Sequence, residues 1–139
     1  MTLCVVDASV ALAWTIDSQR TPAAMAMRAN AGSFDFIAPS IFRVEVRNAL
    51  MKAERRNLIA RADVDAAITE LAAVGVTCPP EPGDDELEAA MLLGRQARLS
   101  LCDALYLQLA QTEGAALASR DASLLAAAHA KGVWIEDCR

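Results

Sequence analysis

The chain has 139 residues, of which 55% are apolar, so it is long enough for one domain with a substantial hydrophobic core. No apolar run is long enough to cross a bilayer, and the start of the chain lacks the basic residues and cleavage site of a signal peptide. We therefore expect a cytoplasmic protein with no membrane contact, folded as a single domain over residues 1–139.

The acidic balance gives no positive support to nucleic-acid binding, since the formal net charge is −5. Four of the 18 acids are singled out below, and the others nearly balance the 13 basic residues. Two divalent cations would neutralise those four. The charge is therefore compatible with a metal-dependent enzyme.

Extended and helical patterns alternate along the chain, which indicates βαβ units around a mainly parallel sheet. We predict strands at 3–6, 34–38, 76–78, 115–118 and 133–135. We predict helices at 8–14, 21–31, 40–57, 63–73, 84–97, 100–113 and 122–131. In the third helix Ser40 is the expected cap, with Ile41, Val44, Ala49 and Leu50 facing inward.

Cysteine usage argues against a zinc site and a redox role. Cys4, Cys78, Cys102 and Cys138 are far apart, and His129 is the only histidine. Zinc sites built from these residue types normally contain closely spaced ligand pairs. We expect the cysteines to be small core residues.

Asp7 and Asp121 each follow a predicted strand and precede a predicted helix. Capping of the helix is the ordinary explanation for either acid. The carboxyl ends of parallel strands are also where open α/β sheets bind ligands. The repetition of the pattern favours a shared site.

Two further acids lie on apolar helix faces. The helical neighbours of Glu45 include no cation, and a carboxylate that faces a core is costly unless it is paired or bound to metal. Asp103 shares a face with Leu107 and Ala110, although Ser100 and Asp103 also have the spacing of a capping box.

Together the four acids form a set of oxygen donors with no nitrogen or sulfur ligand, which suits Mg²⁺ or Mn²⁺. One or two such ions support phosphodiester cleavage. Ser9, Ser119 and Asn48 lie close to these acids in sequence and are candidates to hold a carboxylate in place. Ordinary turn hydrogen bonding is the alternative role for the serines.

Four sequence pieces occur in order over nearly the whole chain. They are Val5-Val6-Asp7-Ala8-Ser9, then Pro39-Ser40 leading to Glu45 and Asn48-Ala49-Leu50, then the run from Asp103 to Ala110, and Leu117-Ala118-Ser119-Arg120-Asp121. In these pieces the chain resembles the PIN-domain family, particularly the VapC-type ribonuclease toxins of bacterial toxin–antitoxin modules. It departs at Ser119, where the family more often has threonine, but the hydroxyl is retained.

The resemblance implies a three-layer α/β/α sandwich and metal-aided endonucleolytic cleavage of RNA. It assigns Asp7, Glu45, Asp103 and Asp121 as the acidic catalytic positions that bind Mg²⁺ or Mn²⁺. It also implies a homodimer and a small antitoxin that blocks the site.

Basic residues near the acids are candidates for RNA backbone contact, and for each a solvated surface is the alternative. They are Arg43, Arg47, Lys52, Arg56 and Arg120. A second hypothesis for the whole chain is a catalytically inactive PIN-like module that only holds a partner protein.

Overall fold

Four parallel strands form the centre of the fold, in the order β2-β1-β3-β4. The computed structural model describes residues 1–139. The strands are β1 (Thr2–Val6), β2 (Phe34–Ile37), β3 (Ala116–Ser119) and β4 (Ile135–Asp137). The two central strands, β1 and β3, are almost entirely apolar and buried, as expected for parallel strands that are covered on both faces.

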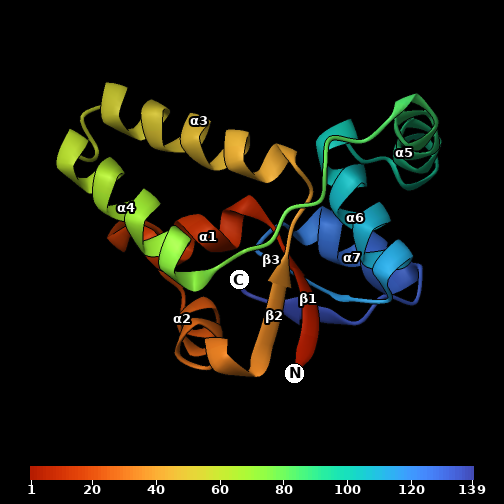
Figure 1. Ribbon diagram of the computed structural model, residues 1–139, viewed down its shortest axis with the longest axis horizontal. Helices are drawn as coiled ribbons and strands as arrows, with labels where there is room; N and C mark the ends of the chain where they lie inside the picture. The colour runs from red at the N-terminus through yellow and green to blue at the C-terminus, as the bar shows by residue number, and fades with distance from the viewer.

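Seven α-helices connect and cover the strands. They are α1 (Ala8–Thr15), α2 (Pro22–Ala29), α3 (Ile41–Arg55), α4 (Arg61–Val74), α5 (Asp84–Ala97), α6 (Leu101–Glu113) and α7 (Ala122–Ala130). Short 3₁₀ turns occupy Asp17–Gln19 and Ala31–Ser33. Figure 1 shows α1 and α2 on one side of the sheet and α6 and α7 on the other. This arrangement confirms the predicted three-layer α/β fold.

The register of the sheet fixes what its carboxyl edge presents. Val6 of β1 pairs with Ala118 of β3, and the Asp7 backbone N–H donates to the Ala118 carbonyl at 3.0 Å. Asp7 and Ser119 therefore leave the two central strands side by side. The carboxyl ends of β1 and β3 lie next to each other, as the sequence predicted for the strands that precede Asp7 and Asp121.

Two of the predicted strands differ from those observed. The segment 76–78 forms only one bridge, between Thr77 and Ile37, because Pro79 and Pro80 follow and cannot donate to a ladder. The last strand is Ile135–Asp137 rather than 133–135, since Val133 still bonds the α7 carbonyl of Ala128. Its polar end is tolerated because β4 lies at the sheet edge.

The start of α3 also corrects the sequence expectation. Ser40 is already in a helical conformation and its side chain makes no capping bond, because the turn begins one residue earlier, with the Phe42 N–H on the Pro39 carbonyl. Val44 is 62% exposed rather than inward, and the buried residues of α3 are Phe42, Val46 and Leu50. These three follow the four-residue helical repeat.

The close approach of α6 to α5 depends on Gly94. A Cβ at this position would lie 3.0 Å from the Leu99 carbonyl oxygen and 3.5 Å from the Ala104 Cβ. The lack of a side chain allows the turn before α6 to lie against α5. The first turn of α6, which carries Asp103, is thereby held in place.

All four cysteines are free thiols. Cys4 and Cys138 are buried, as expected of core residues, whereas Cys78 and Cys102 are half-buried. Burial raises the pKa of Cys4 to about 12 and that of Cys138 to about 11, so both stay protonated. None of the helices is both long and apolar enough to span a membrane.

Candidate active site of four carboxylates

Asp7 is the most buried acid of the chain, with 7% of its surface exposed. It occupies the N-cap position of α1, yet its side chain makes no capping bond. Instead, Oδ2 accepts hydrogen bonds from Ser9 Oγ and Ser119 Oγ, each at 2.8 Å. The ordinary capping explanation therefore does not account for this carboxylate.

The two serines are themselves held by backbone N–H groups of the residues that follow β3. Ser9 Oγ accepts from the Arg120 N–H at 3.1 Å, and Ser119 Oγ accepts from the Asp121 N–H at 2.9 Å. Each serine oxygen thus accepts one hydrogen bond from a backbone N–H, and each hydroxyl donates its proton to Asp7. The network links the end of β1 to the turn between β3 and α7.

The two carboxylate oxygens of Asp121 have different surroundings. Its Oδ1 accepts from the backbone N–H groups of Ser123 and Leu124, at 2.8 and 3.3 Å, so it is the N-cap of α7. Its Oδ2 accepts no hydrogen bond. The capping explanation is therefore correct for Asp121, and one oxygen remains for another ligand.

Glu45 reaches the same region from α3. Its Oε1 accepts a hydrogen bond of 2.7 Å from the Tyr106 hydroxyl of α6. Glu45 is half-buried and forms no ion pair. The prediction that this acid turns away from solvent is confirmed, and a phenol is its partner.

Asp103 lies in the first turn of α6, and only one half of the predicted capping box is present. Its backbone N–H donates to Ser100 Oγ at 3.2 Å, but its carboxylate makes no reciprocal bond. The carboxylate is half-buried and accepts no hydrogen bond.

The charges of the four acids act on one another. Burial is the main cause that raises the pKa values of Asp7, Glu45 and Asp103. In addition, Asp121 raises that of Asp7, while Asp7 and Asp103 raise that of Glu45. Asp7 and Asp121 also raise that of Asp103. These charge interactions connect Asp7 with each of the other three acids, which the sequence places far apart.

No cation of the protein compensates this charge. The two ion pairs of the chain, Arg20 with Asp17 and Arg139 with Asp137, lie elsewhere. No group of three or more His, Cys, Asp or Glu side chains is close enough together to hold one metal ion.

The other candidate residues lie around this cluster. Asn48 is exposed and makes no hydrogen bond to any of the acids. Arg43 and Arg47 flank Glu45 at two residues on either side, which turns them to the opposite face of α3, where they line a groove with α4. Lys52 and Arg56 are exposed at the end of α3, and Arg120 is half-buried next to Asp121.

The sequence reasoning did not identify Tyr106. A signal was available, because Tyr106 follows Asp103 by three residues and therefore lies on the same face of α6. In an apolar helix a tyrosine on the acid-bearing face is a candidate hydrogen-bond donor to a second acid.

Comparison with known proteins shows the family of the chain. The PIN domain family matches residues 4–130. The chain is 39% identical over 110 residues to Ribonuclease VapC3 of Mycobacterium tuberculosis, which is 77% of either chain.

Solved structures share the fold. PAE2754 from Pyrobaculum aerophilum superposes with a TM-score of 0.69 at 24% identity, over 96% of this chain and 89% of that one. VapBC2 from Rickettsia felis, bound to a promoter DNA fragment, superposes with a TM-score of 0.71 at 10% sequence identity, over 99% of this chain and 100% of that one. FitAcB from Neisseria gonorrhoeae superposes with a TM-score of 0.61 at 14% sequence identity, over 96% of each chain. The resemblance read from the sequence is thus confirmed, and the chain belongs to the PIN-domain family.

Proposed function

We propose that this chain is a metal-dependent endoribonuclease and the toxin of a toxin–antitoxin pair, acting in the cytoplasm. The observation that carries the proposal is a buried Asp7 carboxylate, held by two serine hydroxyls at the carboxyl end of β1, whose charge interacts with those of Glu45, Asp103 and Asp121 and which forms no ion pair. The 39% identity to Ribonuclease VapC3 supports RNA as the substrate.

The donor set fits a hard divalent cation. The cluster offers carboxylate oxygens and no imidazole, and the sole histidine, His129, is exposed on α7. Such donors suit Mg²⁺ or Mn²⁺. Asp7, Glu45, Asp103 and Asp121 would hold the ion, which supplies Lewis-acid chemistry for attack of water on a phosphodiester.

The residues of the chain orient this chemistry. The two serine hydroxyls fix Asp7 through Oδ2, which leaves Oδ1 as the oxygen that neither serine contacts. Asp121 is fixed through Oδ1 by the amides of α7 and keeps Oδ2. Each of these acids is therefore anchored by one oxygen and presents the other. Exposed Lys52 and Arg56, together with half-buried Arg120, are the basic residues that we assign to the RNA backbone.

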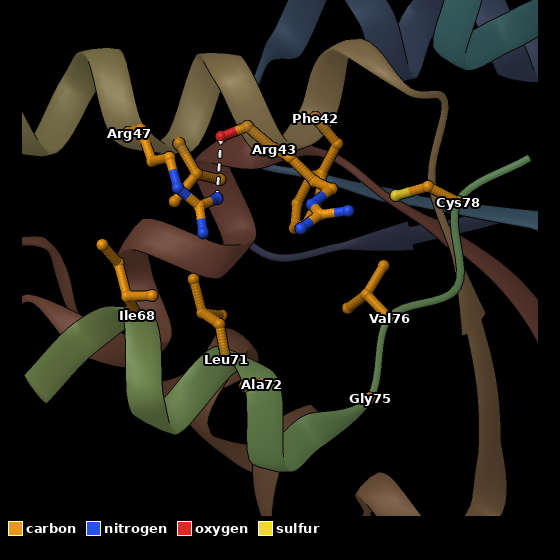
Figure 2. A pocket seen from close by; sticks show the side chains of 10 residues that line it. Phe42, Arg43, Arg47, Ile68, Leu71, Ala72, Gly75, Val76 and Cys78 are labelled. Atoms are coloured by element: carbon orange, nitrogen blue, oxygen red, sulfur yellow. Dashed lines mark hydrogen bonds between the residues drawn. The ribbon is translucent and has the colours of Figure 1, made fainter. Parts of the chain in front are cut away.

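We assign Arg43 and Arg47 to the antitoxin rather than to RNA. Figure 2 shows both side chains in a groove between α3 and α4. Phe42, Val46, Ile68, Leu71 and Val76 form its apolar lining, and no acid lines it. Neither arginine has an ion pair. The groove suits an amphipathic segment with apolar side chains flanked by Asp or Glu, which we propose the antitoxin supplies.

We also propose a homodimer. Large apolar side chains are exposed on α3, α5 and the start of α6, and an unpaired apolar surface favours association. They are Val44, Met51, Met91, Leu92 and Leu101.

Substitution of Asp7 tests the catalytic proposal. We expect Asp7→Asn to reduce Mn²⁺-dependent cleavage of RNA by at least a thousandfold while the circular dichroism spectrum is retained, because a cation ligand is lost but both serine bonds still find an acceptor. Asp65→Asn, an exposed acid of α4, is the control and should cleave normally. Unchanged cleavage by Asp7→Asn would contradict the assignment. A chain that binds its partner without cleaving RNA in either form would favour the inactive module.

The raised pKa of Asp7 gives a stability prediction with a definite sign. Because the folded chain binds this proton more tightly than the unfolded chain, ionisation destabilises the fold at pH values above the ordinary 3.8. In EDTA at pH 7 we expect Asp7→Asn to increase the free energy of unfolding, because the cost of ionising the buried carboxylate is removed. The gain should shrink toward pH 4 in urea titrations. A loss of stability at pH 7 would show that the anchored carboxylate supports the fold.

Charge reversal tests the groove. When the chain is co-expressed with a candidate antitoxin, we expect Arg43→Glu with Arg47→Glu to weaken the complex at least tenfold, about 1.4 kcal/mol, by loss of charge complementarity. Isothermal titration of the separated partners measures this. Arg55→Glu, on the same helix but outside the groove, is the matched control. Equal affinity of the reversed and parent chains would exclude this surface.

Sedimentation equilibrium tests the dimer. We expect twice the chain mass for the parent protein and the mass of one chain for Leu92→Glu, since a buried charge opposes association. Glu88→Gln on the same helix serves as the control. A parent protein that sediments as one chain at all concentrations would refute the dimer.

A further inference from the structure

Tyr106 is fully buried, and its one polar side-chain atom meets the carboxylate cluster. The hydroxyl lies on α6 and bonds Glu45 on α3, 61 residues away in sequence. Phenylalanine would fill nearly the same volume. What the tyrosine adds to this position is the hydrogen bond to Glu45.

The Tyr106 hydroxyl is the sole hydrogen-bond donor to Glu45 in the structure. Glutamate has three rotatable side-chain bonds, and Asp7 and Asp103 are close enough to repel its charge. Without a donor, both effects favour rotation of the carboxylate toward solvent. The phenol opposes this rotation.

We propose that Tyr106 is a positioning residue that holds the Glu45 carboxylate in the cluster, ready for the divalent cation. With Oε1 occupied by the phenol, Oε2 is the oxygen available to the ion. The inference rests on the proposed function, since it presupposes that the four acids bind a cation.

The placement of Tyr106 on α6 gives the arrangement its rigidity. Asp103 and Tyr106 are three residues apart on one helix face, so α6 contributes one acid directly and fixes a second that α3 supplies. Tyr106 is buried and Glu45 Oε1 is the one acceptor of its hydroxyl, so the phenol proton is directed at this carboxylate.

Removal of the hydroxyl tests the proposal. We expect Tyr106→Phe to weaken Mn²⁺ binding about tenfold or more in isothermal titration, the range typical when a partner of a metal ligand is lost. Thr15→Val is the matched control, because it deletes a hydroxyl that bonds the Ala11 carbonyl away from the acids. The control should bind Mn²⁺ like the parent protein, and thermal melts should show that both variants fold.

A double-mutant cycle separates positioning from a general effect on the fold. If Tyr106 acts through Glu45, adding Tyr106→Phe to Glu45→Gln should leave the remaining Mn²⁺ affinity unchanged. An equal loss in both backgrounds, or no loss in the single variant, would overturn the proposal.

The sequence offers a spectroscopic measurement that needs no substitution at Tyr106. The chain contains one tyrosine, so 3-fluorotyrosine incorporated in its place gives a single ¹⁹F resonance from this position. Mg²⁺ should shift this resonance in the parent protein and leave it unmoved in Glu45→Gln. If the parent protein binds no Mn²⁺ or Mg²⁺, the proposed function fails. If it binds the ions but the resonance and the Tyr106→Phe affinity stay unchanged, only the role of Tyr106 fails.

Discussion

The parallel pairing of β1 with β3 is the constraint on which the site depends. Their register sets Asp7 beside Ser119, and the hydroxyls of Ser9 and Ser119 then converge on one oxygen of Asp7. Both strands pack their apolar side chains in the core, and a shift in their register would carry Asp7 along the strand axis and away from Ser119. The hydrophobic core thereby also secures the geometry of the charged groups above it.

Ionisation of the acids in this cluster lowers the stability of the fold. Three of its acids have raised pKa values, which means that their ionised forms cost folding free energy. The core offsets this cost through a continuous apolar cluster that joins β1 and β3 to α1 and α6. Polar partners are provided one by one, by serine hydroxyls, helix amides and a phenol, and none of these donors carries a charge. The negative charge is thus kept available for a ligand.

Sequence patterns predicted the fold, and they singled out the four acids as candidates, because both depend on local features. Asp7 and Asp121 stand where apolar strands end, and Glu45 stands on a helix face without cations. The exposed Val44 was wrongly assigned to the core because an apolar residue does not by itself define the buried stripe of α3. Tyr106 escaped prediction because its partner lies on another helix, and the contact exists only after α3 and α6 have packed. The last strand was predicted two residues too early, at 133–135 instead of Ile135–Asp137, because an edge strand need not be apolar and an apolar pattern does not mark its position.

The strand order carries a consequence for synthesis of the protein. The Ser119 hydroxyl bonds a residue that precedes it by 112 positions, and β3 must insert beside β1 before Asp7 gains that contact. A chain that has been synthesised only as far as the end of α6 therefore lacks one of the two hydroxyl donors to Asp7, and the network around this carboxylate is completed only after β3 has paired with β1.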